Sequence, residues 1–251
     1  QQSDNAQLES DRNAQKADSY KKLMATYADK NADYVATVID PSQYDYQILM
    51  QFVNDKTFMD NVTAYDKLVD EYVASFNAPD DELYIQEFDN SEAADFMKAN
   101  VPYFECPDKE LEKTYYFRWW TFRKHVKSTP EGYVITEFLP QVGWSGKYNT
   151  INCPAMHQFS EGRWLINAEY MADYARHWCR EKEDASKYSY PMAYSFLEFH
   201  KVHPDMALLG ESYDDLKTIY SMWYDKRWDE EAGMFWQLDG YDGMEVSISG
   251  S

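Results

Sequence analysis

The chain has 251 residues, 44% of them hydrophobic and 17% aromatic, which is enough for one large domain or two small ones with a sizeable core. Its formal net charge of -20 argues against a nucleic-acid partner, because phosphate binding needs a basic surface. No run of residues approaches the ~18 apolar positions of a membrane span, so we expect none. A neutral or weakly charged ligand fits this composition better.

The aromatic content is the most unusual feature of the composition. Eight Trp and 22 Tyr supply side chains that join an apolar body to a polar tip, the combination that carbohydrate clefts need. The alternative is that most of these rings pack helix against helix.

Three cysteines, Cys106, Cys153 and Cys179, match neither a disulfide scaffold nor a zinc site, because their spacing is too wide. We expect three buried thiols, with a Cys106–Cys153 bridge as the alternative in an oxidising compartment. The chain begins without Met, which fits either a mature end left by signal-peptide removal or an arbitrary boundary. The expected location is therefore periplasmic or secreted.

The first third of the chain predicts helices and no chemical constellation. Residues 1–17 are polar and predict a tail; apolar spacing from Ser19, and again from Tyr46, predicts two helices. A third helix is predicted from Phe58 to Phe76, ending where Pro79 follows. Residues 1–76 are therefore expected to form a helical region of unknown role.

Residues 108–125 predict a long helix with Asp108 as its N-cap. It carries five aromatic rings in the six positions 115–120, which cover every face, so we expect it to be buried nearly all round. Buried Arg118 would then need a partner, either as a strut between helices or facing a substrate.

Residues 133–139 are β-branched and predict a short strand that includes Glu137. The loop that follows, residues 140–150, carries Trp144 and Asn149, and such loops tend to lie over a cleft. The alternative is a surface loop whose Trp144 packs down.

Pro154 predicts the start of a helix running to about Arg180. On it His157, Glu161 and Trp164 are spaced to share one face, with Gln158 and Arg163 nearby, a set suited to binding sugar hydroxyls. His157 and Glu161 lack the further ligands of a zinc motif, so we expect no metal. Helices over 187–200 and 213–228 follow, joined by short connectors, which predicts helical hairpins packed side by side.

The last segment, residues 235–251, places Trp236 and Tyr241 beside three carboxylates, Asp239, Asp242 and Glu245. Flat rings can stack on the C–H faces of a sugar, and a carboxylic acid can protonate a glycosidic oxygen. Its Gly and Ser content is typical of an active-site loop, so we expect that the chain is part of a larger protein.

Several motifs resemble the six-hairpin glycosidases, and more narrowly the mannosylglycerate-hydrolase-like and trehalase-like enzymes related to glycoside hydrolase family 63. The resemblance covers about residues 77–251 and rests on five stretches, residues 114–125, 135–140, 149–151, 161–165 and 235–245. It implies a mainly α protein, the N-terminal portion of an (α/α)6 toroid with short β segments in its loops, with residues 77–251 as part of the catalytic domain.

The resemblance also implies inverting hydrolysis, of the α-glycosidase type, by a carboxylic acid and a carboxylate. The Gly-x-Asp step that carries the acid in these relatives corresponds to Asp242. The Ser-Pro-Arg that commonly follows it is absent, which leaves Asp239 and Glu245 as competitors. The partner base has no counterpart in this chain, and the missing C-terminal half is expected to supply it.

The sequence therefore predicts a glycoside hydrolase whose partner is a carbohydrate and whose general acid is Asp242. Trp144 and Trp236 are expected to form the sugar platform. The other candidate substrate-binding residues are Arg118, Glu137, Asn149, His157, Gln158, Glu161, Arg163, Trp164 and Tyr241. No cofactor is expected, and calcium is left open. The alternative is a non-catalytic carbohydrate-binding or helical scaffold protein; a helical repeat fits less well, because no repeat period is found.

Overall fold

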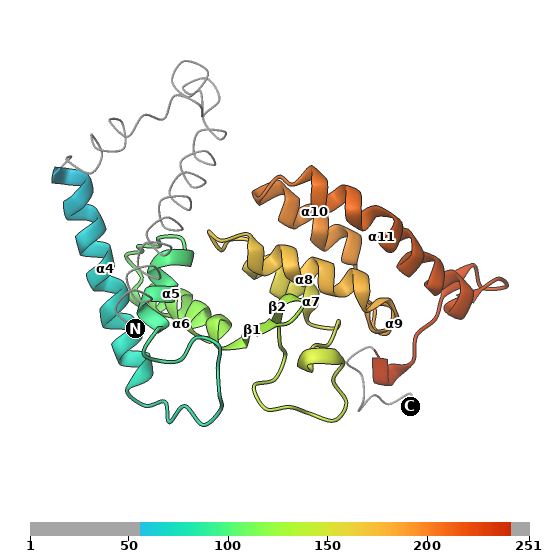
Figure 1. The fold of residues 1–251 in the computed structure, drawn as a ribbon, viewed down its shortest axis with the longest axis horizontal. Helices are drawn as coiled ribbons and strands as arrows, with labels where there is room; N and C mark the ends of the chain where they lie inside the picture. Colours follow the sequence, from blue (N-terminus) through green and yellow to red (C-terminus); the bar gives the residue numbers. More distant parts are fainter. Residues whose placement is uncertain (1–55, 242–251) are drawn as a thin grey trace, which may run out of the picture. The chain divides into compact units, whose positions relative to one another are not determined.

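The computed structural model describes residues 56–241, which form a mainly helical chain with two short β-hairpins (Figure 1). The expected helical class with short β segments is confirmed. The expected tail over residues 1–17 and the helices expected near Ser19 and Tyr46 lie outside the described residues. None of the described helices combines the length and apolar character needed to cross a membrane.

The chain divides into two compact units. Among the described residues, unit 1 comprises residues 56–81 with Asn90–Trp120, and unit 2 comprises Glu82–Asp89 with residues 121–241. The expected domain boundary near residue 77 stays a prediction.

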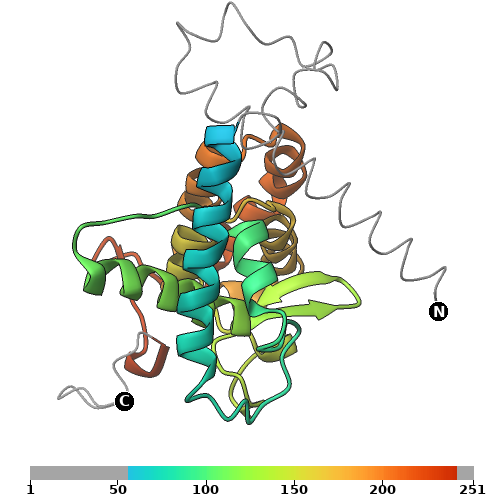
Figure 2. The ribbon, with the colours of Figure 1, turned by 90° about the vertical axis from the view of Figure 1, so that its left-hand side faces the viewer.

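Unit 1 contains α4 (Lys56–Asn77), α5 (Ala93–Asn100) and most of α6 (Lys109–His125). Both long helices were predicted, and α6 begins where Asp108 Oδ1 accepts hydrogen bonds from the N–H groups of Glu110 (3.1 Å) and Leu111 (3.2 Å). Helix α5 was not predicted, because eight residues give little periodicity. Figure 2 shows α4 as the long blue helix of this unit.

One buried carboxylate joins α6 to α4. Glu112 accepts hydrogen bonds from Tyr72 Oη, Lys109 Nζ and the Cys106 N–H, each at 2.8 Å. Burial by itself would raise the pKa of Glu112, but these donors outweigh it and hold the pKa below its usual range.

The prediction that the aromatic helix is buried nearly all round is wrong. Tyr116, Trp119 and Trp120 are buried, whereas Phe117 is 44% exposed and Arg118 is exposed. The physical reason is that α4 covers one side only, through the ring stack of Tyr72 on Tyr116 and the hydrogen bond from Trp120 to Asn77.

Unit 2 opens with an antiparallel hairpin of β1 (Val126–Thr129) and β2 (Gly132–Ile135), with Val126 opposite Ile135 (Figure 2). The sequence predicted one strand over 133–139, but pairing ends at Ile135. The partner strand β1 was missed, because it follows α6 without a break.

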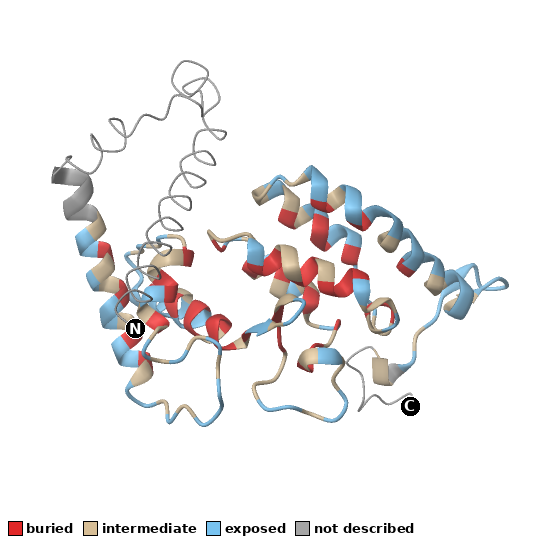
Figure 3. Cartoon of the chain, viewed as in Figure 1, coloured by how far each residue is buried: buried red, intermediate tan, exposed pale blue. Residues whose placement is uncertain are grey.

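The rest of unit 2 is helical. Its elements are η2 (Lys147–Asn149), α7 (Ala155–Gly162), α8 (Glu169–Arg180), α9 (Lys182–Ala185), α10 (Met192–Val202), α11 (Met206–Arg227), β3 (Trp228–Asp229), β4 (Met234–Phe235) and η3 (Asp239–Tyr241). Helix α11 packs against both α8 and α10, and α10 also packs against α7 (Figure 1). All four helices carry buried residues (Figure 3).

The predicted helix over 154–180 is two helices. Helix α7 ends at Gly162, and α8 begins at Glu169. The Glu169 N–H donates a hydrogen bond to Asn167 Oδ1 at 3.0 Å. Helix α11 begins at Met206, before the predicted Tyr213, because Asp205 caps it by accepting from the Leu208 N–H at 2.9 Å.

All three cysteines are free thiols. Only Cys179 is buried, while Cys106 is half-buried and Cys153 is exposed, so the expectation of three buried thiols is correct for one of them.

Candidate functional site

The end of strand β2 gathers several of the residues that were predicted to bind a sugar. Gln158 on α7 donates from Nε2 to the Thr136 carbonyl at 3.3 Å and accepts from Tyr174 Oη at 2.6 Å. The Glu137 N–H donates to the Asn149 carbonyl at 3.4 Å. Tyr174 was missed by sequence reasoning; it is buried on α8 and stacks on Phe159, with ring centroids 5.2 Å apart.

Asn149 is 2% exposed and organises the loop between β2 and α7 from within. Its Nδ2 donates to the carbonyls of Phe138 (2.6 Å) and Pro140 (3.0 Å), and its Oδ1 accepts from Ser145 Oγ (2.7 Å) and the Val142 N–H (3.3 Å). These four bonds use the hydrogen-bonding capacity of the amide. Asn149 therefore shapes the loop, and its side chain is not positioned to contact a ligand directly.

Lys147 fixes the same loop from outside. Its Nζ lies 2.7 Å from Glu131 Oε2 and 3.1 Å from Glu181 Oε1, so it joins the loop to the residue before β2 and to the end of α8. The hydrogen bonds that Lys147 donates to Glu131 and Glu181 raise the pKa of Lys147. The side chain is 39% exposed, so each ion pair contributes little by itself.

Trp144 stands on the outside of this anchored loop, 67% exposed. Among the described residues, the Trp144 ring contacts one other aromatic ring, that of Phe138, in an edge-to-face arrangement with centroids 6.1 Å apart. A face of the indole is therefore open to a ligand, as a stacking platform requires.

The second group of predicted residues lies around the end of α7. His157 is exposed and Glu161 is half-buried, while Trp164 is 43% exposed and lies beyond the last turn of the helix. The expectation that His157, Glu161 and Trp164 share one helical face is therefore wrong for Trp164, because α7 stops at Gly162.

Arg163 is committed to two local contacts. Its Nη1 pairs with Glu198 Oε2 on α10, and its guanidinium lies 5.1 Å from the Trp164 ring centroid. Hydrogen bonds from Lys201 and from Arg163 hold the pKa of Glu198 below its usual range. The ion pair with Glu198 thus holds the Arg163 guanidinium beside the Trp164 ring.

The third group forms around Tyr241, at the end of the described chain. Its ring lies 5.4 Å from Lys187 Nζ, 5.9 Å from the Arg227 guanidinium and 5.6 Å from the Tyr188 ring. Arg227 also covers Trp223 at 4.4 Å and donates from Nη2 to the Lys187 carbonyl at 2.9 Å. This anchor was not found from the sequence, because its residues are far apart along the chain.

The remaining candidates are placed as follows. Trp236 follows β4 and is 49% exposed, and its backbone N–H donates to the Arg227 carbonyl at 3.0 Å. Arg118 belongs to unit 1. Asp242, Glu245 and the side chain of Asp239 lie outside the described part of the chain, so the choice among the three carboxylates stays a prediction. Within residues 56–241, no group of three or more His, Cys, Asp or Glu side chains could hold a metal ion.

Comparison with known proteins assigns a family to part of the chain. Residues 147–251 match the mannosylglycerate hydrolase MGH1-like glycoside hydrolase domain. The resemblance inferred from the sequence is thereby confirmed for this stretch, which is similar to a glycoside hydrolase domain. It contains the second and third groups of residues, and Trp144 lies just before it.

A solved structure titled "Sialidase" is also similar. Its TM-score is 0.69 at 38% sequence identity, and the match covers 74% of this chain and 18% of that chain. The present chain thus spans less than a fifth of the structure it matches. No curated protein matches.

Proposed function

We propose that the protein hydrolyses glycosidic bonds, with inversion at the anomeric carbon and with Asp242 as the general acid, because residues 147–251 match a glycoside hydrolase domain. The observation that carries this proposal is the family match itself, which includes the step Gly240-Tyr241-Asp242. The proposed substrate is an oligosaccharide or glycoside.

The chemistry needs two carboxyl groups roughly 6.5–9.5 Å apart, one to protonate the leaving oxygen and one to activate a water on the opposite face of the sugar. Asp242 would supply the proton. The family resemblance assigns no residue of these 251 as the base, so we propose only the acid.

The anchored Tyr241 supports this assignment. The turn of η3 is held by Arg227, Lys187 and Tyr188, and Asp242 follows it directly in the sequence. A proton donor must be held in a defined position to act, because small displacements cost much of the rate. The exposed rings of Trp144 and Trp236 are proposed to stack on the sugar.

Replacing Asp242 by Asn tests the assignment. In the longest polypeptide that contains this chain, Asp242→Asn should lower kcat by about two or more orders of magnitude, since a positioned acid contributes about that much. The measurement is release of reducing sugar, with melting temperature as a check on folding. Asp239→Asn and Glu245→Gln test the two competing carboxylates and should keep most of the activity if Asp242 is the acid; hydrolysis by Asp242→Asn at the parent rate would refute the assignment.

The stereochemistry can be read independently. Proton NMR of the first anomer released from an α-glycoside should show the β-anomer, as inversion requires. If calorimetry shows oligosaccharide binding while no variant or parent releases sugar, the protein is a non-catalytic carbohydrate-binding protein instead.

A further inference from the structure

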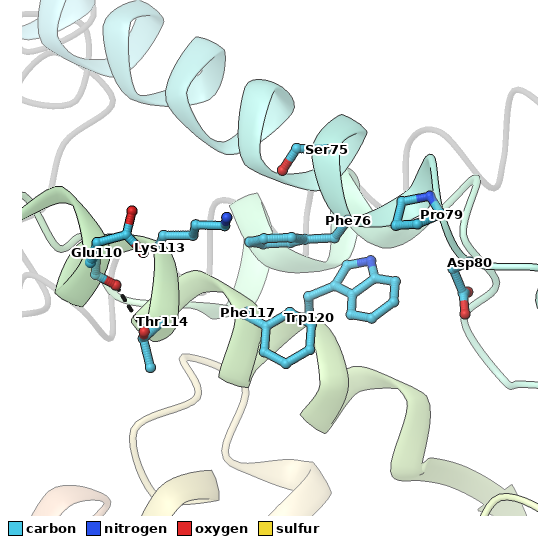
Figure 4. Close-up of a pocket in the computed structure, with 9 residues that line it drawn as sticks. All are labelled: Ser75, Phe76, Pro79, Asp80, Glu110, Lys113, Thr114, Phe117 and Trp120. Atoms are coloured by element: carbon cyan, nitrogen blue, oxygen red, sulfur yellow. Dashed lines mark hydrogen bonds between the residues drawn. The ribbon is translucent and has the colours of Figure 1, made fainter.

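Unit 1 contains a cavity that belongs to neither the matched domain nor the groups described above. It measures about 550 Å³, within the roughly 300–1,000 Å³ typical of small-molecule sites. It lies between the end of α4, with the two residues Pro79 and Asp80 that follow it, and the part of α6 up to Trp120 (Figure 4). Its lining residues are Ser75, Phe76, Pro79, Asp80, Glu110, Lys113, Thr114, Phe117 and Trp120.

Three aromatic rings form the apolar part of the lining. Phe117 is 44% exposed and is supported by two buried rings, Trp120, with which it stacks at 5.8 Å and 22°, and Phe76, which meets it edge-on at 5.3 Å. This packing fixes the Phe117 ring while leaving part of it open. A fixed, flat, open ring is suited to the C–H face of a pyranose.

Hydrogen-bond donors and acceptors surround the rings. The hydroxyls of Ser75 and Thr114 donate to the carbonyls of Tyr72 (2.7 Å) and Glu110 (2.8 Å), so each hydroxyl oxygen remains an acceptor toward the cavity. Among the described residues, the Lys113 ammonium and the Glu110 carboxylate take part in no hydrogen bond or ion pair. Figure 4 shows Lys113 reaching along the cavity toward Phe76.

The charges and polarity of the lining narrow the ligand class. Two carboxylates, Asp80 and Glu110, outnumber the one ammonium of Lys113, and the chain carries a net charge of -20, so a carboxylated or sulfated ligand is disfavoured. A purely apolar ligand would strip water from these charged groups without replacing it. A neutral ring that has hydroxyls on its edge and C–H bonds on its face satisfies both constraints.

We propose that this cavity in unit 1 is a binding site for a neutral saccharide, with Phe117 as the stacking platform and Lys113 as the principal hydrogen-bond donor. The site lies outside residues 147–251, so it extends recognition of carbohydrate beyond the proposed hydrolytic domain and does not depend on hydrolysis. It would hold a sugar unit whether or not Asp242 is the acid.

Isothermal titration calorimetry with maltohexaose, cellohexaose and mannohexaose tests the proposal on the 251-residue chain carrying Asp242→Asn, which removes the proposed acid. Phe117→Ala should lower the affinity for at least one of these sugars by about fivefold or more, since stacking on a ring contributes about that much. Lys113→Met should lower it by about fivefold, and this exposed position leaves the helix core intact. Leu111→Ala is the matched control, because Leu111 is 53% exposed on the same helix and does not line the cavity.

The outcomes separate this site from the proposed active site. Affinity that falls in Phe117→Ala and Lys113→Met but not in Leu111→Ala supports the cavity, even if no hydrolysis is ever detected. Absence of binding for all three hexasaccharides overturns the proposal. So does binding that is lost only in Trp144→Ala or Trp236→Ala, and so does tighter binding of oligogalacturonate than of the neutral sugars.

Discussion

At the scale of single residues, the structure gives an unusual environment to a histidine that the sequence analysis did not select. His157 was predicted to bind the substrate and lies exposed on α7, whereas His177 is fully buried on α8. His177 Nε2 lies 3.0 Å from Thr150 Oγ1, whose hydroxyl donates to the Lys147 carbonyl, so the ring nitrogen is the donor. Its Nδ1 is buried and has no partner among the described residues. Burial lowers the pKa of His177 to about 4.

This pKa predicts a loss of stability in mild acid. Because the pKa of His177 is lower in the folded state, neutral His177 contributes fully to the free energy of unfolding above pH 6.5, the pKa of an unfolded histidine. This contribution is lost as the pH falls toward 4. Between these values the free energy of unfolding should drop by about 3 kcal/mol through His177 alone. Urea denaturation of the parent and of His177→Gln at pH 7, 5.5 and 4 measures how the free energy of unfolding changes with pH in each protein. An equal change in both proteins would show that His177 does not titrate in this way.

At the scale of elements, the end of α7 packs closely against its neighbours at one glycine. A Cβ added at Gly162 would lie 2.9 Å from the Phe122 ring and would also meet Met171 Sδ, so the end of α7 approaches its neighbours as closely as a side-chain-free residue allows. This close approach precedes Arg163 and Trp164 directly, and thereby sets where that ring emerges. Gly210 in α11 has nothing within 4 Å of the same position.

The two glycines should therefore respond in opposite ways to Ala. Gly162→Ala forces a side chain into a packed core and is expected to lower the free energy of unfolding by about 1–3 kcal/mol. Gly210→Ala removes backbone freedom from the second turn of α11 and is expected to raise it by about 0.5–1 kcal/mol. Chemical denaturation of both variants beside the parent is the measurement, and a Gly162→Ala protein as stable as Gly210→Ala would contradict the packing described for α7.

At the scale of the whole molecule, charge is the dominant property. The chain carries 44 acidic and 24 Lys or Arg side chains, and many ion pairs of the described residues are exposed, as in Lys67–Glu71 at 77% and 65%. Exposed pairs contribute little each, while the excess of like charge disfavours the compact state.

Added salt should therefore stabilise the protein. Raising NaCl from 10 to 150 mM at pH 7 shortens the screening length to about 8 Å and weakens the repulsion among carboxylates. The melting temperature, followed by circular dichroism, is expected to rise by about 2–5 °C. A fall over this range would mean that the attractive ion pairs outweigh the net repulsion.

The sequence by itself determined the helical class, the course of α4 and α6 and the N-cap of α6 at Asp108. These features depend on residues close together in the chain, where apolar spacing and side-chain capping act. It also carried the glycosidase resemblance, since motifs are local by nature. The choice among Asp239, Asp242 and Glu245 stays a prediction.

Only the tertiary structure decided which faces are covered and which polar groups are already engaged. Phe117 and Arg118 share a helix with buried rings yet are exposed, because α4 packs against one side of α6 alone. The side-chain amide of Asn149, which was predicted to bind a ligand, forms its hydrogen bonds within its own loop. Tyr241 is held by Arg227 and Lys187 from other elements. Burial and pairing depend on residues distant in sequence, and no pattern within one segment can report on them.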